Sequence, residues 1–208
     1  MLFVLWLILA IMELVPISYC RISTISKPCC VPSHFRCVMD VTGGYTDPTS
    51  GRMLFVDRKV RLYNDYSLNV TRTDTDVTLP SGATFVHSEL TFYNQHISYK
   101  IDGDRCQTDH IAALMQDKCI PDDAVLLETS RIGQSGHDGI NVSTWRYVTA
   151  DNITILRAVT VDQCWPIYQT EQSVSSNGVL SSMEYMISNI ELGEVPDLIA
   201  TPNICTKT

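Results

Sequence analysis

The chain is short of basic residues. Its 15 Lys and Arg stand against 23 Asp and Glu, which gives a formal net charge of −8. No basic stripe is present that could neutralise the phosphates of a nucleic acid, so nucleic acid is excluded as a partner. Internal repeats, low-complexity tracts and linkers are also missing from the sequence. We therefore expect one folded domain, because the length fits one.

Long apolar runs are missing after the first 18 residues, MLFVLWLILAIMELVPIS. The apolar core at residues 2–12 is shorter than the roughly 20 residues that a membrane span needs. It fits the apolar region of a secretory signal peptide, although the basic n-region is absent, and an N-terminal membrane anchor is the alternative. We predict a signal peptide over residues 1–20, cleaved between Ser18 and Cys20, a single domain over 21–208, and no later transmembrane segment.

Catalytic motifs are absent as well. The stretch GQSGHDG (133–139) contains Ser135 and His137, but a nucleophile elbow, G-x-S-x-G, would need glycine where His137 stands. Triad members also come from separate elements rather than from one short stretch. We interpret these residues as a glycine-rich surface loop and predict no catalytic residue. A secreted hydrolase acting through Ser135 and His137 is the competing hypothesis.

Metal-binding signatures are similarly scarce. No C-x-x-C or H-E-x-x-H motif and no EF-hand loop occurs. The stretch CCVPSHFRC (29–37) brings three cysteines and a histidine together, but an oxidising compartment and the wrong spacing argue against zinc. Asp102-Gly103-Asp104 could offer oxygens to calcium, although the simpler interpretation is a turn that ends a strand. We predict no metal ligands among the side chains.

Cysteine, by contrast, is plentiful, and in a secreted chain it indicates disulfides. If Cys20 leaves with the signal peptide, an odd number remains and one cysteine is unpaired or intermolecular. Three N-x-[ST] sequons begin at Asn69, Asn141 and Asn152, which we predict to be glycosylated and therefore at the surface. The eight cysteines are Cys20, Cys29, Cys30, Cys37, Cys106, Cys119, Cys164 and Cys205.

Apolar residues alternate with polar ones along much of the chain, which is the period of a half-buried strand. The pattern is clear over residues 56–62, 86–92, 93–101 and 153–161. An Asn177-Gly178 turn predicts a hairpin between strands at 167–175 and 179–190. One stretch, 108–118, has helical spacing of its apolar residues and a capping residue, so we expect one short helix there.

The expected fold class is therefore all-β with one short helix. A sheet of many antiparallel strands must curl, pair with a second sheet or close on itself. Curled sheets have a concave apolar face, and such faces commonly bind apolar ligands. The alternating aromatic residues fit core packing and the lining of a lipid pocket equally well; they are Tyr93, Tyr99, Trp145, Tyr147 and Trp165.

Five motifs, in order from Cys29 to Cys205, make the chain resemble the ependymin-related family of secreted glycoproteins. The first is Cys29-x-x-Pro32-x-x-Phe35, and the second is FVDRKVRLYND (55–65), which is similar to the family's "YD…R-V-R" strand. The others are DGDRCQ (102–107), WRYVTADNITILRAVTVDQCWP (145–166) and MISNIELGEVPDLIATPNIC (186–205). Two departures stand out: Val56 replaces the tyrosine of "YD", and the cysteine that often follows the "R-V-R" strand is missing.

The resemblance implies a pairing of the cysteines. Carried over from the family, the bridges join Cys29 to Cys164 and Cys106 to Cys205. We predict a third bridge between Cys37 and Cys119, which this chain has in place of the family's missing cysteine. Cys30 would then be the unpaired cysteine.

The resemblance also implies a fold and a function. The fold is two stacked, curved antiparallel sheets around a hydrophobic pocket, like bacterial lipoprotein carriers, often as a homodimer. The function is a secreted, non-enzymatic glycoprotein that binds a lipid or fatty acid in the pocket, with no cofactor. The alternative is a calcium-binding protein of cell–matrix adhesion in the extracellular space or the lysosome, with calcium held by glycans in some members. The ligand-binding residues are not predicted.

Overall fold

Most of the described residues lie in eleven β-strands. A computed structural model describes residues 27–78, 82–133, 139–175, 178–194 and 196–205. The strands are β1 (His34–Thr46), β2 (Met53–Asp65), β3 (Val70–Thr78), β4 (Thr84–Phe92), β5 (Ile97–Asp102), β6 (Arg105–His110), β7 (Val125–Ile132), β8 (Ile140–Val148), β9 (Thr154–Thr160), β10 (Pro166–Val174) and β11 (Leu180–Leu192). Short helical turns are η1 (Tyr93–Gln95), α2 (Pro196–Ile199) and η2 (Asn203–Cys205).

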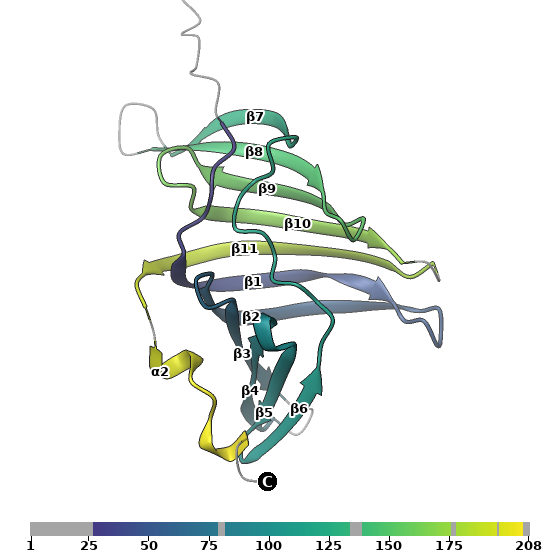
Figure 1. Cartoon of the computed structure of the whole chain (residues 1–208). Coiled ribbons are helices and arrows are strands. Elements are labelled where there is room, and N and C mark those ends of the chain that lie inside the picture. The colour runs from purple at the N-terminus through teal and green to yellow at the C-terminus, as the bar shows by residue number, and fades with distance from the viewer. Residues whose placement is uncertain (1–26, 79–81, 134–138, 176–177, 195, 206–208) are drawn as a thin grey trace, which may run out of the picture.

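All eleven strands belong to one antiparallel sheet in the order β6-β5-β4-β3-β2-β1-β11-β10-β9-β8-β7. Every neighbouring pair is consecutive in the chain except β1 and β11, which join two meanders at the centre of the sheet. In that central region Met39 lies opposite Ile187 on one side and Val60 on the other. The sheet curls, so that β3–β6 turn away from the plane of β7–β11 (Figure 1).

The predicted all-β class and the curved antiparallel arrangement are confirmed, and the described residues do include a short α-helix, α2, although it lies at Pro196–Ile199 and not where the sequence predicted it. The predicted count of two stacked sheets is wrong, because β1 and β11 are hydrogen-bonded along their length and join the meanders into one continuous sheet. Alternation along a strand predicts which side chains share a face, but it does not say which strands are neighbours. The predicted hairpin between 167–175 and 179–190 is confirmed as β10 and β11.

The helix predicted at 108–118 is also wrong. Residues up to His110 form β6, which pairs with β5 across a turn at Gly103, and the chain then continues without a helix. The reason is topological, because β6 and β7 lie at opposite edges of the sheet. An extended chain advances about 3.3 Å per residue and a helix only about 1.5 Å, so an extended connection spans the sheet in few residues.

We call this connection, residues 111–124, the strap, and the face of the sheet that it crosses the inner face (Figure 1). The N-terminal residues 27–33 run alongside it. The amide of Val31 donates to the carbonyl of Lys118 at 2.9 Å, and the amide of Ile120 donates to the carbonyl of Cys29 at 2.9 Å. The strap is therefore backed by a second length of extended chain.

The described residues contain three disulfides, two of which hold the strap and the N-terminal segment in place. The bonds Cys29–Cys164 and Cys106–Cys205 are those that the family resemblance implies. The prediction for Cys37 and Cys119 is wrong: Cys119 is bonded to Cys30, its antiparallel bridge partner. Cys37 lies in β1 with its side chain buried, so it does not reach the strap and has a free thiol.

Among the described residues, many of the buried hydrophobic side chains gather in three separate clusters. One lies under the strap around Trp145 and Val159, a second beside the first residues of β1 around Phe35, and a third beneath α2 around Leu90. Among the described residues no helix is long and apolar enough to cross a membrane. The separation of the clusters leaves room on the inner face for a cavity.

Candidate ligand-binding site

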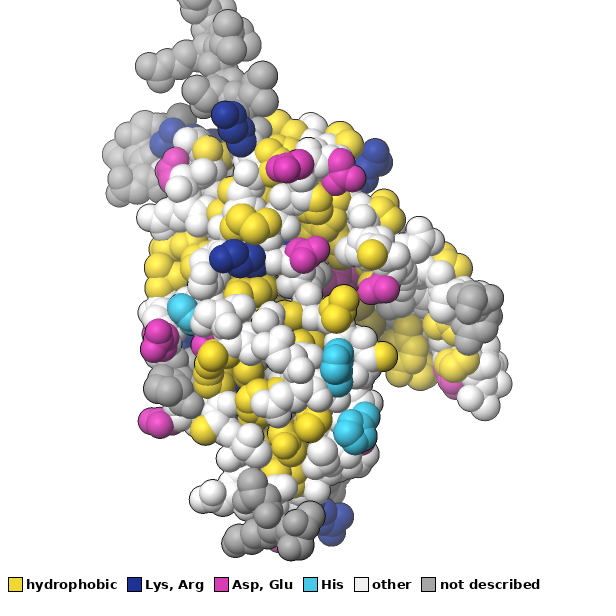
Figure 2. Space-filling view, in the orientation of Figure 1, with side chains coloured by type: hydrophobic (Ala, Val, Ile, Leu, Met, Phe, Trp, Pro, Cys, Tyr) yellow, Lys and Arg dark blue, Asp and Glu magenta, His cyan; other side chains and the backbone are white. Residues whose placement is uncertain are grey.

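A cavity of about 190 Å³ lies between the inner face and the strap. The sheet supplies its floor, and Met115 and Gln116 of the strap, with Val31 beside them, supply its roof. Figure 2 shows hydrophobic and polar side chains interspersed over this side of the molecule. The sheet and η1 residues that line the cavity, with Tyr66 after β2, are Phe35, Met39, Leu62, Asn64, Tyr66, Thr71, Tyr93, Arg157, Pro166, Gln169, Glu171, Tyr185 and Ile187.

One side of the cavity is apolar. Met39, Leu62 and Ile187 are partly buried and pack against the cluster that contains Val31 and Phe35. They share a face because neighbouring strands place them in cross-strand rows, such as Met39 opposite Ile187. This side of the cavity offers contacts suited to an aliphatic chain.

The other side is polar and is built by one cross-strand row. Trp145 of β8, Arg157 of β9, Gln169 of β10 and Tyr185 of β11 lie opposite one another in register. Arg157 is only 3% exposed and Gln169 only 7%. The Nε of Arg157 donates to Oε1 of Gln169 at 2.7 Å. A buried guanidinium therefore stands at one end of the cavity.

On the polar side of the cavity, the carboxylate of Glu171 accepts three hydrogen bonds. Its Oε1 accepts from Nε2 of Gln169 at 2.6 Å and from Nε2 of Gln116 at 3.2 Å. Its Oε2 accepts from the hydroxyl of Tyr185 at 3.1 Å. The bond from Gln116 links the strap to the sheet directly, so the roof is positioned by side chains as well as by disulfides.

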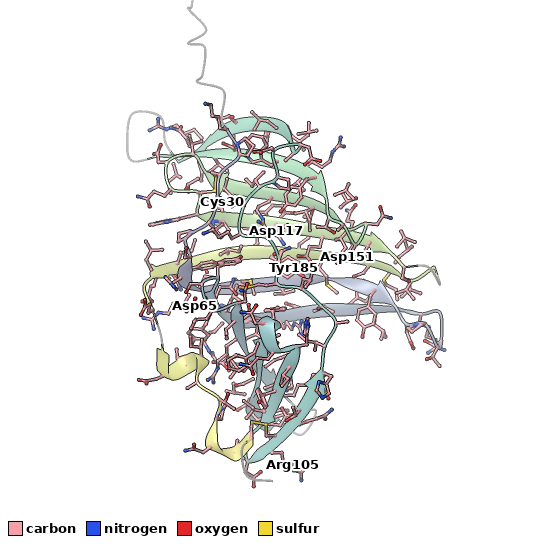
Figure 3. All side chains as sticks on the ribbon, viewed as in Figure 1. Cys30, Asp65, Arg105, Asp117, Asp151 and Tyr185 are labelled. Carbon is pink, nitrogen blue, oxygen red and sulfur yellow. A yellow bond between two sulfur atoms is a disulfide. The ribbon has the colours of Figure 1, made fainter. Side chains whose placement is uncertain are left out.

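Burial governs the titration of the tyrosines around the cavity. Burial raises the pKa of Tyr66 to about 12, although the charge of Arg157 opposes the rise. Burial, the charge of Glu171 and the hydrogen bond to Glu171 all raise the pKa of Tyr185. Both phenols therefore stay neutral at physiological pH. Figure 3 labels Tyr185 on the sheet and Asp117 on the strap. The main-chain carbonyl of Asp117 accepts a long hydrogen bond from Nη1 of Arg157, at 3.5 Å.

The strap is fixed over the cavity at its far end. Consecutive residues of an extended chain point to opposite sides. Cys29 accordingly turns toward the sheet and bonds to Cys164 in the β9–β10 loop, whereas Cys30 bonds to Cys119 of the strap. Cys164 is not in a strand; it has a φ of 55° and closes the loop with its amide donating to Thr160.

The aromatic residues singled out in the sequence divide between two roles. Tyr93 lines the cavity, whereas Trp145 and Tyr147 are buried in the sheet. Tyr99 packs edge-on against Phe92 with ring centroids 6.1 Å apart. Trp165 lies in the β9–β10 loop, half-buried.

The other candidate positions lie away from the cavity. Asp102 is the last residue of β5, where its Oδ1 is 2.7 Å from Nδ1 of His87. In the described part of the chain, no group of three or more His, Cys, Asp or Glu is placed to hold a metal ion. Ser135 and His137 fall outside the described residues. Asn141 and Asn152 are exposed, and Asn69, in the β2–β3 turn, is half-buried.

Sequence reasoning missed Arg157. In the alternating stretch 153–161, Arg157 falls on the same side of the strand as the apolar residues Ile155 and Val159. A charged residue at an apolar position was the available signal, because Arg is almost never buried without a partner. Gln169 and Glu171 share the same parity along β10 and face the same cavity.

Comparison with known proteins identifies the family. The family model described as Ependymin matches residues 81–205. No curated protein matches the chain. An uncharacterized conserved protein from Thermus thermophilus is similar in structure at 9% identity, with 86% of this chain and 88% of that chain covered and a TM-score of 0.45. A LolA superfamily protein from Nitrosomonas europaea has 10% identity, 82% and 91% coverage and a TM-score of 0.37. The family match covers more than half of the sequence, and the chain belongs to the ependymin family.

Proposed function

We propose that this protein is a secreted, non-enzymatic binding protein that holds a hydrophobic or amphipathic small molecule between its inner face and its strap. The observation that carries the proposal is the cavity of about 190 Å³, with Met39, Leu62 and Ile187 on one side and a hydrogen-bonded polar row on the other. Ligand pockets commonly combine a largely apolar lining with a few placed polar groups.

The size of the cavity limits what it holds. Ligand pockets usually measure about 300–1,000 Å³, and this cavity is smaller. A short aliphatic chain fits as it stands. A longer chain requires Met115 and Gln116 to turn away, and a second hollow of about 380 Å³, which both residues also line, gives them space.

Secretion and glycosylation belong to the same proposal. Three disulfides suit an oxidising compartment, and the predicted signal peptide leads to one. The exposed side chains of Asn141 and Asn152 leave room for glycans, and Asn69 is the third proposed acceptor. Enzymatic release of glycans in ¹⁸O-water tests this part, because each occupied asparagine becomes a labelled aspartate.

Native mass spectrometry of the secreted, non-reduced protein tests the binding function. We expect a stoichiometric adduct that is extracted by organic solvent and is identified as a lipid. The Ile187→Glu variant places a charge in the apolar side of the cavity and should lose the adduct. Phe55→Glu is the matched control, because Phe55 is 87% exposed and does not line the cavity.

Two results would contradict the proposal. One is an empty wild-type protein that also takes up no added fatty acid or alcohol of any chain length. The other is an adduct that survives Ile187→Glu in a variant that still melts cooperatively, since the bound molecule would then lie elsewhere.

A further inference from the structure

Arg157 has no acidic partner among the residues that the structure describes. It is only 3% exposed, yet it takes part in none of the ion pairs found there. Buried charges in proteins are normally paired, because moving an ion out of water costs several kcal/mol. The missing counter-charge therefore needs an explanation.

The guanidinium also has donors to spare. Arginine carries five N–H groups in a planar fork. The Nε group donates to Gln169, and Nη1 makes the long bond to the carbonyl of Asp117. Within the described part of the chain Nη2 donates to no protein acceptor. The ring of Tyr147, with its centroid 5.8 Å from Cζ of Arg157, attracts the cation but accepts no conventional hydrogen bond. Because Arg157 lines the cavity, its spare donors are available to a molecule inside it.

Glu171 does not supply the counter-charge. The side chain of Gln169 stands between the two groups, accepting from Arg157 through its oxygen and donating to Glu171 through its nitrogen. Both carboxylate oxygens of Glu171 already accept hydrogen bonds, from Gln169, Gln116 and Tyr185. The charge of Glu171 is thus satisfied by neutral donors, and the charge of Arg157 is not satisfied by an acid.

We infer that Arg157 binds the carboxylate of an amphipathic acid, whose aliphatic chain lies against Leu62 and Ile187. This inference rests on the proposed function, because it names the class of ligand for the same cavity. The planar fork of arginine matches a carboxylate, and such bonds are stronger than those between neutral groups. The row from Arg157 to Tyr185 fixes the polar end, and the apolar side receives the chain.

Isothermal titration calorimetry with octanoate and 1-octanol, on delipidated wild-type protein, tests the inference. The two probes have the same chain and differ in the head group. We expect octanoate to bind at least about tenfold more tightly than 1-octanol, the discrimination that one charge-assisted pair supplies. Raising the salt concentration should weaken octanoate little, because the pair is buried.

Variants of Arg157 then assign the preference to this residue. Arg157→Met keeps an unbranched apolar stem and removes the guanidinium, so octanoate and 1-octanol should bind with similar affinity. Arg157→Lys keeps the charge without the fork and should retain part of the preference. Cooperative melting and an intact mass with three disulfides show which variants are folded.

The outcomes distinguish failure of the proposed binding function from failure of the carboxylate assignment to Arg157. If neither probe binds wild-type protein at any concentration below its solubility, and fatty acids and alcohols of other chain lengths do not bind either, the proposed function fails. If both bind wild-type protein equally, the function stands and the carboxylate assignment is overturned. A preference for octanoate that persists in folded Arg157→Met also overturns it. Should Arg157→Met not fold, the wild-type comparison and Arg157→Lys decide the question.

Discussion

Cys29 and Cys30 are adjacent in the chain, but the sulfur of Cys29 is bonded to the sheet side of the molecule and the sulfur of Cys30 to the strap. Cys29 holds the N-terminal segment to the sheet through Cys164, and Cys30 holds the strap to the N-terminal segment through Cys119. The N-terminal segment is therefore bonded to the sheet, and the strap is bonded to the N-terminal segment. The disulfide Cys30–Cys119 can be removed while Cys29–Cys164 stays intact.

Replacing Cys30 and Cys119 together by serine should loosen the strap. The bridge joins residues 89 apart, for which the chain-entropy model gives about 4–5 kcal/mol, and the two remaining bridges reduce the loss. Hydrogen exchange should speed up at the amides of Val31 and Ile120, which pair the segment with the strap. Exchange followed by peptide mass spectrometry measures this.

The matched control for that variant is the removal of Cys106 and Cys205. Their bridge spans a similar 99 residues but joins β6 to η2. It should lower stability by a comparable amount without faster exchange at Val31 and Ile120. Equal exchange at these amides in the two double variants would show that Cys30–Cys119 does not hold the strap.

The free thiol of Cys37 should be unreactive in the native protein. Burial raises the pKa of Cys37 to about 12, so almost no thiolate is present at physiological pH, and the side chain is only 3% exposed. Iodoacetamide should label Cys37 only after unfolding, as peptide mass spectrometry of non-reduced protein can show. Rapid labelling of the native protein at about pH 7.5, well below the usual pKa of a thiol, would contradict the buried position.

Asp65 should make the protein sensitive to acid. Burial alone would raise the pKa of this carboxyl, but hydrogen bonds from Ser67 and Leu68, with the charge of His34, outweigh it and hold the pKa below the usual value of 3.8. A depressed pKa contributes stability that is present above about pH 4 and is lost as the pH falls through the folded-state value.

The variant Asp65→Asn isolates that contribution. The asparagine keeps one acceptor but removes the charge, so the substitution should lower the free energy of unfolding by about 1–3 kcal/mol near neutral pH. Denaturant unfolding at several pH values should show the difference between wild type and variant shrinking below about pH 4. Asp47→Asn is the control on another turn, since Asp47 is less buried and makes similar bonds. A difference that stays constant from neutral pH to strong acid would rule out the charge as the cause.

Gly43 should tolerate no side chain. It has a φ of 147° in β1, and a Cβ built on it would lie 2.9 Å from Cα of Met183 and still closer to the carbonyl of Ser182. Both are backbone atoms of β11, so the strands would have to part. We expect Gly43→Ala to lower the free energy of unfolding by about 2–3 kcal/mol, which is at the upper end of the range for strained or overpacked sites.

Gly51→Ala separates this close approach from backbone strain alone. Gly51 also has a positive φ, 69°, but a Cβ added there would have no other atom within 4 Å. Gly51→Ala should lower the free energy of unfolding by only about 1 kcal/mol. Thermal unfolding of both variants measures the difference, and equal losses would mean that the contact with β11 is unimportant.

The strands were predictable because alternation is a local property. Residues 56–62 and 153–161 repeat it clearly, and both stretches form strands over most of their length. The order of the strands was not predictable, since the β1–β11 pairing joins Arg36 to Glu191, far apart in the sequence. The apolar spacing of Leu114 and Met115 suggested a helix, yet Leu114 is 80% exposed and Met115 faces the cavity.

The candidate site was less predictable than the fold. The cavity exists because β1–β3 and β9–β11 meet under the strap, and no single stretch of sequence contains that relationship. Arg157 was nevertheless marked by its position within an apolar pattern. The pairing of Cys30 with Cys119 followed from strand-like bridging of two extended segments, which the family resemblance did not indicate.

The β1–β11 seam has a consequence for how the chain folds. Within each meander, neighbouring strands are hairpins and can form early, because only short loops must close. The seam instead joins the first strand to the last, with Arg36 reaching Glu191 across 155 positions. Contacts of such long range slow folding. During synthesis, the edge of β1 that pairs with β11 therefore stays unpaired until residues 180–192 have left the ribosome.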